Sequence, residues 1–388
     1  MGSLRVALVH PFSWPEVRRG GERLLHDLAW YLQSAGHHVE VVTAATGEPV
    51  TEEVDGVVFR RLRLPRPAVL ERRGLGPIDT FGAPALLALA RRRYDVVHSL
   101  TPTGAIAGRL SGHRPVYTVL GHPAAEDFAL RRGSLALFRA GVRAAAATVA
   151  LSRSAASRVE QHTGHAPEVI PPGVRLDRFT PDLAARRGPV RVLFASDASE
   201  IRKGVHVAMA AVVRLRRRGV DARLVLAGPG DPRWALTGVG AGASPVLARV
   251  DPLAVAGLGA DGEAALEATE QVEADSSAMP ELYRSATVTV LPSWQEAFGL
   301  VLAESLACGT PVACADDGGM LEVVDTPEVG RTAPFGDPDA LADAIAGAAE
   351  LAADPATPAR CAAHARRWGW AESVGPAYVD LYRRVVRR

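Results

Sequence analysis

Lysine occurs only once in this chain, at Lys203, although lysine and arginine together number 44. The other 43 (44 − 1) are therefore arginines. A codon bias against lysine explains its rarity but not its position between Arg202 and Gly204. An ammonium group is a compact cation with three rotatable donors, whereas a guanidinium is a rigid planar fork. We therefore predict that Lys203 serves a site built around a phosphate oxygen or a crowded reacting centre.

Two glutamates, Glu296 and Glu304, form the second group that could do chemistry. They flank the start of a predicted helix near Phe298, which follows a predicted strand ending at Leu291. Free amides and the positive end of the helix dipole at residues 298–300 would favour an anion. Carboxylates suit sugar and ribose hydroxyls, because a charged acceptor makes a stronger hydrogen bond. Taken alone, the pair could equally be surface side chains on a helix and its cap.

The elements that must position these residues alternate between strands and helices. In the first half, buried-strand patterns and helical spacings lead to strands at 4–9, 39–43, 95–98, 116–120 and 148–151, with helices at 21–35, 83–92, 104–110 and 135–146. In the second half the strands are 193–196, 223–227, 288–291 and 312–315, with helices at 205–218, 279–286, 300–307 and 338–352. This alternation predicts parallel strands joined by helical crossovers.

A segment with four prolines, Pro167 to Pro181, separates the two halves and predicts a domain junction. We expect an N-terminal Rossmann-like domain at 1–180 and a C-terminal Rossmann-like domain at 181–370. Two doubly wound units would place ligands at the carboxyl ends of their strands. Residues 232–278 do not fit the alternation and predict a surface excursion or extra small elements.

The net charge of +1 hides an asymmetry. Residues 1–180 hold 23 Arg and 16 acids (+7), whereas residues 181–388 hold 21 Lys+Arg and 27 acids (−6). The basic half could contact an anionic membrane surface or a phosphorylated ligand, although solvated arginine faces are the favoured explanation. No zinc-finger spacing and no basic strand with interleaved aromatic residues occurs, so we expect no nucleic-acid partner.

Three cysteines without metal-ligand spacing indicate reduced thiols. No stretch approaches the roughly 18 apolar residues of a membrane span, and the start lacks a signal-peptide pattern. We expect a cytoplasmic protein, a monomer or homodimer, with peripheral contact at the inner membrane face through the basic half as an open option.

The segment from Glu296 to Glu304, continuing to Val312, resembles the E-x7-E region of retaining glycosyltransferases of family four, which have the GT-B fold. Further segments resemble family motifs in the same order: Gly20-Gly21-Glu22-Arg23, Asp95-Val96-Val97-His98, Val169-Ile170-Pro171-Pro172-Gly173-Val174 and Arg202-Lys203-Gly204. The resemblance is weakest at 48–80 and 232–278. It implies an α/β fold with two Rossmann-like domains facing across a cleft, of which 1–180 would bind the acceptor and 181–370 the nucleotide sugar. It also implies a final helix, 371–388, that packs back on the N-terminal domain.

The resemblance also implies roles for individual residues. Lys203 and Arg202 would neutralise the donor diphosphate. The amides of Phe298, Gly299 and Leu300 would assist them. Glu304 would bind the ribose and Glu296 the donor sugar, while His122 would face the reacting sugar. Gly20 and Gly21 would let the backbone approach the phosphate or the acceptor.

One departure from the family pattern concerns the donor phosphates. Ser196, which we include in the donor site, and Asp197 stand where the family usually has Gly-Arg. Either Asp197 points away, or Arg202 supplies the second charge, or the donor binds weakly. The pair Asp316-Asp317 lacks D-x-D spacing and is interpreted as turn-forming.

The expected function is glycosyl transfer from a nucleotide-diphosphate sugar to a hydroxyl of a small natural product, a sugar or a lipid. The resemblance implies retention of configuration, no metal and no cofactor. Two alternatives stay open: a catalytically altered nucleotide-sugar-binding protein, and a phosphorylase or epimerase on the same fold. A phosphorylase with pyridoxal phosphate would need Lys203 for its Schiff base.

Overall fold

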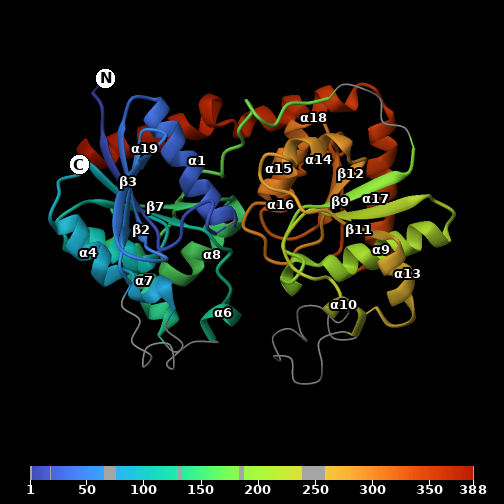
Figure 1. Ribbon diagram of the computed structural model, residues 1–388, viewed down its shortest axis with the longest axis horizontal. Helices are drawn as coiled ribbons and strands as arrows, with labels where there is room; N and C mark the ends of the chain where they lie inside the picture. Colours follow the sequence, from blue (N-terminus) through green and yellow to red (C-terminus); the bar gives the residue numbers. More distant parts are fainter. Residues whose placement is uncertain are drawn as a thin grey trace. The chain divides into compact units, whose positions relative to one another are not determined.

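The computed structural model describes residues 2–17, 19–64, 76–129, 133–182, 188–237 and 258–387. The chain divides into two compact units: Met1–Gly173 with Trp370–Arg388, and Val174–Gly369 (Figure 1). The first boundary thus lies at residue 173 and not at the predicted residue 180. The reason is that the amide of Val174 donates to the carbonyl of Trp368 (2.7 Å), and the Phe179 ring meets that of Tyr283 (5.9 Å between centroids).

The sheet of the first unit has the strand order β3-β4-β2-β1-β5-β6-β7-β8. Neighbouring strands are parallel except for β3 and β4, which are antiparallel. The strands are β1 (Arg5–Val9), β2 (His38–Ala44), β3 (Val50–Val54), β4 (Val57–Leu62), β5 (Val96–Ser99), β6 (Pro115–Val119), β7 (Ala147–Ala150) and β8 (Glu168–Val169). The strand order reverses between β1 and β5, the position at which doubly wound sheets bind their ligands.

The β3–β4 hairpin lies in a region for which the sequence analysis predicts no element. Its turn is formed by Asp55 and Gly56, which both have positive φ (51° and 77°). An Asp-Gly pair with two positive φ angles is typical of a tight hairpin turn. The signal was therefore present in the sequence, although the strands around it are exposed or half-buried rather than buried. Residues 65–75, also in this region, lie outside the described residues.

Helices cover the first sheet, and four of them lie where the apolar spacing predicts helices, at 21–35, 83–92, 104–110 and 135–146. They are α1 (Gly20–Ser34), α3 (Pro77–Thr80), α4 (Gly82–Ala90), α5 (Pro102–Leu110), α6 (Ala125–Ala129), α7 (Ser134–Ala144), α8 (Arg153–Thr163), a π-helical turn (Trp370–Val374) and α19 (Gly375–Arg387). On α1 the inward stripe includes Leu24, Leu28 and Leu32, which are buried. The hydroxyl of Ser152 caps α8 by accepting from the amide of Ala155 (3.0 Å).

The last helix, α19, belongs to the first unit. The hydroxyl of Tyr382 lies 2.6 Å from Nδ1 of His98 on β5. On the other side of the ring, Nε2 lies 2.7 Å from the hydroxyl of Thr118 on β6. Burial lowers the pKa of His98 to about 3, so the imidazole is neutral at physiological pH. This buried polar network fastens α19 to β5 and β6.

The sheet of the second unit is parallel, with the order β11-β10-β9-β12-β13-β14. Its strands are β9 (Val190–Phe194), β10 (Ala222–Leu226), β11 (Thr269–Gln271), β12 (Val288–Leu291), β13 (Val312–Ala315) and β14 (Gly330–Ala333). The predicted pair of doubly wound parallel units is therefore confirmed. In this sheet the strand order reverses between β9 and β12.

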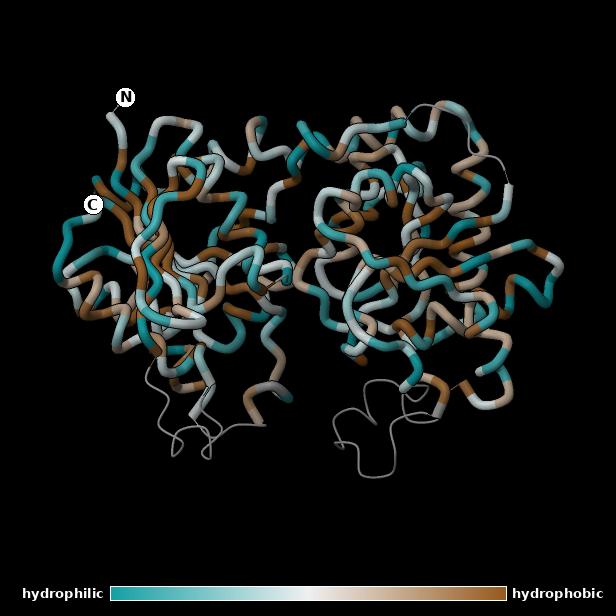
Figure 2. The backbone as a smooth tube through the Cα atoms, viewed as in Figure 1, coloured by the Kyte–Doolittle hydropathy of each residue, from teal (hydrophilic) through white to brown (hydrophobic). Residues whose placement is uncertain are grey.

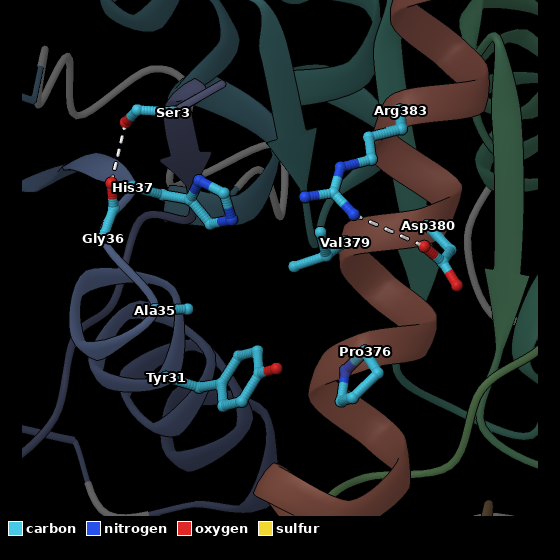
Figure 3. Close-up of a pocket in the computed structure, with 9 residues that line it drawn as sticks. All are labelled: Ser3, Tyr31, Ala35, Gly36, His37, Pro376, Val379, Asp380 and Arg383. Atoms are coloured by element: carbon cyan, nitrogen blue, oxygen red, sulfur yellow. Dashed lines mark hydrogen bonds and ion pairs between the residues drawn. The ribbon is translucent and has the colours of Figure 1, made fainter. Parts of the chain in front are cut away.

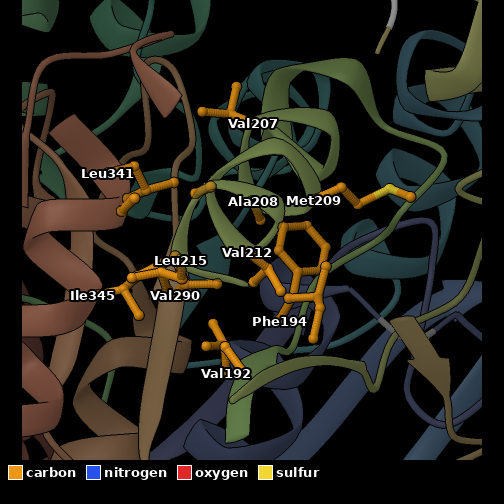
Figure 4. Packing of buried hydrophobic residues seen from close by; sticks show 14 of the residues in the cluster. Val192, Phe194, Val207, Ala208, Met209, Val212, Leu215, Val290, Leu341 and Ile345 are labelled. Atoms are coloured by element: carbon orange, nitrogen blue, oxygen red, sulfur yellow. The ribbon is translucent and has the colours of Figure 1, made fainter. Parts of the chain in front are cut away.

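The helices of the second unit surround this sheet. They are α9 (Val205–Arg217), α10 (Trp234–Thr237), α13 (Gly262–Glu267), α14 (Met279–Ser285), α15 (Leu300–Ala307), α16 (Met320–Val323), α17 (Pro338–Ala353) and α18 (Thr357–Ala365), with 3₁₀ turns at Ile201–Lys203, Gly259–Asp261 and Arg366–Trp368. Figure 4 shows buried side chains of α9, α17 and the strands packed together, among them Phe194, Val212 and Ile345. Figure 2 shows the same concentration of apolar residues along the strands.

The region 232–278 contains small elements, as expected, in its described part. These are α10, the turn at Gly259–Asp261, α13 and β11, and β11 extends the sheet beside β10. Residues 238–257 lie outside the described residues. Across the described ranges, no helix is both long and apolar enough to cross a membrane.

Candidate functional site

The predicted donor-site residues of the second unit lie on loops that leave β9 and β12. These strands are parallel neighbours, so both loops leave the same edge of the sheet where the strand order reverses. The amide of Trp294 donates to the carbonyl of Arg202 (2.9 Å) and joins the two loops. Gly204 has φ 73°, and a Cβ there would lie 2.3 Å from the carbonyl oxygen of Pro292. Only glycine permits this approach directly after Lys203.

Lys203 and Glu296 form an ion pair. The Nζ atom of Lys203 lies 2.7 Å from Oε2 of Glu296, and Nη1 of Arg202 lies 3.6 Å from the same oxygen. The side chains of Lys203 and Glu296 are 16% and 15% exposed. Burial alone would raise the pKa of Glu296, but the charges of Lys203 and Arg202 outweigh it, so the pKa is lowered. Glu296 is therefore ionised at neutral pH, next to two cations.

Arg202 is positioned by contacts on both sides. Its Nη2 atom lies 2.9 Å from a carboxylate oxygen of Glu200. Its Nη1 atom donates to the carbonyl of Trp294 (3.2 Å). The guanidinium is thus fixed beside Glu296 and supplies a second positive charge at this edge of the sheet.

Asp197, which stands where the family has arginine, is engaged in its own turn. Its Oδ1 atom accepts from the amide (2.9 Å) and the hydroxyl (2.6 Å) of Ser199. The neighbouring Ser196 carbonyl faces Gly228, where a Cβ would lie only 1.9 Å away. The residues after β9 therefore pack closely against the loop after β10, and the Asp197 carboxylate shapes this turn.

The helix after Glu296 begins at Leu300, the first residue of the predicted helix 300–307, and Phe298 lies just before it. Gly299 adopts the left-handed conformation (φ 93°) and forms the N-cap. Its carbonyl accepts from the amide of Leu302 (2.9 Å), so the amides of Leu300 and Val301 stand at the open end of the helix. The Phe298 ring is 3% exposed and meets the Trp368 ring edge-on (5.6 Å), so this side chain serves packing.

Glu304 lies inside α15 and is 2% exposed. The hydroxyl of Tyr283 on α14 donates to its Oε2 atom (3.0 Å). Tyr283 is itself fully buried, and its carbonyl accepts from the hydroxyl of Thr310 (2.6 Å). Motif spacing could not identify Tyr283, because its role depends on how α14 packs against α15.

The loop after β13 packs against the backbone of residues 295–297, next to the ion pair. A Cβ atom on Gly318 would lie 2.3 Å from the carbonyl oxygen of Glu296, and a Cβ atom on Gly319 would lie 2.3 Å from that of Ala297. Both positions therefore require glycine. A carboxylate oxygen of Asp317 accepts from the amide of Gln295, whose φ is positive (50°). Asp317 thus fixes the turn beside Glu296, as expected of a turn-forming acid. Within the described ranges, no three His, Cys, Asp or Glu side chains are grouped as a metal site.

The remaining predicted site residues belong to the first unit. Gly20 and Gly21 open α1, after β1, and a Cβ on Gly21 would lie 2.6 Å from Cδ1 of Leu120. His122 follows β6 and is 7% exposed. Its Nε2 atom lies 2.9 Å from the hydroxyl of Ser154 on α8, a partner that the sequence analysis does not identify.

Two doubly wound parallel units, one of which carries a lysine–glutamate pair and a helix start where its strand order reverses, define the class of GT-B glycosyltransferases. Residues 18–178 match the family model described as Glycosyltransferase Family 4, and residues 189–350 match the model described as Glycosyl transferases group 1. The chain belongs to glycosyltransferase family 4.

Sequence relatives and solved structures agree with this assignment. The D-inositol 3-phosphate glycosyltransferase of Xylanimonas cellulosilytica is 31% identical over 93% of this chain and 91% of its own length. Among solved structures, sucrose-phosphate synthase from Thermosynechococcus elongatus is similar with a TM-score of 0.75 at 23% identity, covering 98% of each chain. The Anabaena protein HepE, solved with UDP and glucose, has a TM-score of 0.70 at 17% identity, covering 98% of this chain and 99% of that one. At these identities the structures show a common fold.

Proposed function

We propose that this protein transfers a sugar from a nucleotide-diphosphate sugar to a hydroxyl of a small phosphorylated polyol, with retention of configuration and without a metal ion. The observation that carries the proposal is the Lys203–Glu296 pair at the edge of the second sheet, beside Arg202. Inositol phosphates are the first acceptors to examine, since the relative from Xylanimonas cellulosilytica is named for D-inositol 3-phosphate.

The donor end of the reaction uses the charge of this pair. The Lys203 ammonium has three N–H donors, and the bond to Glu296 engages one of them. The remaining donors, with Arg202 and the amides at the start of α15, are available to the donor diphosphate. Glu296 is ionised and would accept from hydroxyls of the donor sugar, and Glu304 from the ribose.

Catalysis in this proposal rests on the leaving diphosphate. As the glycosidic bond breaks, positive charge develops on the sugar ring and negative charge on the diphosphate. Fixed cations and helix amides aimed at the diphosphate stabilise this separation of charge more than they stabilise the ground state. The acceptor hydroxyl attacks from the same face, and a donor phosphate oxygen takes its proton. A pair of carboxylates acting as general acid and base is then not required.

The acceptor end of the proposal rests on the first unit. Residues 1–180 carry a charge of +7 (23 arginines and 16 acids), which attracts a phosphorylated acceptor. His122, held by Ser154, would lie close to the reacting sugar. We therefore narrow the proposed acceptor class from small natural products, sugars and lipids to small polyols that carry a phosphate.

The first experiment identifies the donor and then measures transfer. A thermal-shift panel of UDP-, GDP-, ADP- and TDP-sugars should raise the melting temperature for the true donor, because a ligand of the folded state stabilises it. With that donor, D-inositol 3-phosphate should be glycosylated and unphosphorylated inositol should react far more slowly. Transfer at equal rates would refute the phosphorylated acceptor, and donor binding without transfer to any phosphorylated polyol would refute the acceptor class.

Site variants then test the ion pair. Lys203→Ala and Glu296→Gln should each reduce kcat by at least about 100-fold, the usual effect of losing one transition-state donor. Arg223→Ala removes an exposed cation of β10 in the same unit and serves as the matched control. Wild-type turnover in Lys203→Ala would contradict the assigned site.

Two further measurements address the stereochemistry and the metal. NMR of the product, compared with the donor, should show the same anomeric configuration. Transfer in excess EDTA should proceed at the rate without chelator. Inverted configuration or a rate restored only by added Mg²⁺ or Mn²⁺ would contradict these parts of the proposal.

A further inference from the structure

A pocket lies in the first unit, between the C-terminal end of α1 and the face of α19. It has a volume of about 400 Å³, and small-molecule sites in proteins begin at roughly 300 Å³. Gly20 and Gly21 lie at the opposite end of α1, a helix of 15 residues that spans about 20 Å. The hollow is therefore remote from the glycine loop, and the proposed transfer reaction makes no use of it.

His37 provides a hydrogen-bond donor in the wall of this pocket. Its Nδ1 atom accepts from the amide of Leu4 (3.1 Å), which places the hydrogen of the neutral ring on Nε2. Burial, followed by the charge of Arg383, lowers the pKa of His37, so the ring is neutral at physiological pH. Figure 3 shows the ring projecting into the pocket toward Arg383.

Two more donors face the same space. One terminal nitrogen of Arg383 points toward Asp380 and the other toward His37 (Figure 3). The hydroxyl of Tyr31 points across the pocket toward Pro376. Burial raises the pKa of Tyr31, so this hydroxyl keeps its proton and can donate. Guanidinium, imidazole and phenol groups thus meet around one hollow.

The remaining wall includes the apolar side chains of Val379 and Pro376, and one acid lies at its edge. The Val379 side chain is buried, and the Tyr31 ring is held by stacking on Trp370 (6.2 Å between centroids, 26°). The Asp380 carboxylate lies 3.7 Å from Arg383 and is 65% exposed, and one of its oxygens faces the guanidinium in Figure 3. This separation is too long for a hydrogen bond, so Arg383 keeps donor capacity for a ligand.

We propose that this pocket is a binding site for a small organic anion, a phosphate ester or a carboxylate, held by Arg383, His37 and Tyr31. The guanidinium binds the anionic group, and the imidazole and phenol donate to its remaining oxygens. The side chains of Val379 and Pro376 contact the body of the ligand. Because it joins α1 to α19, the bound anion stabilises the packing of the last helix on the first unit.

Calorimetric titration tests this site with three probes: inorganic phosphate, glucose 6-phosphate and citrate. The donor site also attracts phosphate, so the titrations use the Lys203→Ala protein, in which that site is weakened. We expect glucose 6-phosphate or citrate to bind this protein more tightly than inorganic phosphate does, because the hollow is larger than one phosphate group. Comparison of the two organic anions distinguishes a phosphate ester from a carboxylate as the preferred ligand.

Variants of α19 locate the binding. Arg383→Gln should weaken the affinity for the organic anion by about tenfold or more, the effect of losing a charge-assisted hydrogen bond. Arg384→Gln removes the same charge from the next residue, which is outside the pocket and pairs with Glu168, and should leave the affinity unchanged. Asp380→Asn releases Arg383 from its anionic neighbour and should tighten binding several-fold.

Tyr31→Phe provides a second test if Arg383→Gln does not fold. It removes one hydroxyl, keeps the ring stacked on Trp370, and should weaken binding by about two- to tenfold. The proposal is overturned if none of the three anions binds, or if binding is equal in the Lys203→Ala protein with and without Arg383→Gln. Transfer activity is not the readout, so this outcome is independent of the proposed reaction.

Discussion

The ammonium group of Lys203 lies 2.7 Å from a largely buried carboxylate, with one guanidinium close by. This crowding makes the identity of the cation testable. Lys203→Arg keeps the charge but replaces a compact ammonium by a planar fork that is longer and less adaptable. We expect kcat/KM for the donor to fall by at least about tenfold, measured in a steady-state transfer assay with Arg202→Lys as the reciprocal exchange. Equal kcat/KM in Lys203→Arg would show that only the charge matters.

The buried contact between Tyr283 and Glu304 leads to a second prediction. Tyr283→Phe removes a donor from a buried carboxylate, which should lower the free energy of unfolding by about 1–3 kcal/mol. A double-mutant cycle with Glu304→Gln, measured by urea unfolding, isolates the pair. If the hydroxyl positions Glu304 for the ribose, the KM for the donor should also rise in Tyr283→Phe. An additive cycle would contradict this coupling.

Site residues could be predicted from the sequence where the charge of the side chain itself indicated its role. Lys203, Arg202 and Glu296 were predicted as one group, and the structure brings them together. Tyr283 and Asp317 were not predicted as partners of these residues. Each acts on a loop or helix that is distant in the sequence, so only the packing of α14 and of the loop after β13 reveals its contact.

Helix α9 offers a matched pair of glycines at its two ends. Gly204 and Gly219 have φ angles of 73° and 84°. A Cβ atom on Gly204 would lie 2.3 Å from the carbonyl oxygen of Pro292, whereas a Cβ atom on Gly219 would have no atom within 4 Å. Gly219→Ala should therefore cost only the backbone strain, about 1 kcal/mol. Gly204→Ala should cost clearly more in urea unfolding and should also reduce transfer, because Lys203 would move. Equal costs would show that the close approach is not required.

Regular elements followed from periodicity, and irregular ones did not. The predicted bounds of β12, β13 and α15 agree with the structure. The left-handed conformation of Gly299, which forms the N-cap of α15, could not be deduced from apolar spacing. The β3–β4 hairpin was missed because β3 is exposed throughout and β4 buries only Val57 and Phe59, so neither strand has the apolar run that marked the others.

The buried network around His98 makes the stability of the protein depend on pH. The pKa of His98 is about 3 in the folded chain and 6.5 for an exposed histidine. Between these values the unfolded chain binds the proton and the folded chain does not, so stability rises with pH across this window. The slope from this group is about 1.4 kcal/mol per pH unit.

This dependence can be measured by urea unfolding at pH 6.5 and pH 5. The wild-type protein should lose about 2 kcal/mol more than His98→Gln between the two values, because glutamine does not titrate. Using the difference between the two proteins cancels the contributions of all other groups. Parallel losses in both proteins would contradict a neutral buried His98.

The two-unit organisation of the whole molecule followed from the alternation and from the proline-rich segment. What the composition could not locate was the exact boundary. Residues 174–180 lie between the prolines of the predicted junction, yet Val174 and Phe179 pack within the second unit. Such contacts are long-range in the sequence, and local composition does not encode them.

The first unit is built from both ends of the chain, Met1–Gly173 and Trp370–Arg388, with the second unit inserted between them. The ends of this insertion are neighbours, because Val174 and Gly369 form a β-bridge. During synthesis the ribosome therefore delivers all of the inserted unit before α19. The first unit lacks α19, which packs on β5, until the inserted unit has been synthesised, so we expect the first unit to complete its folding last.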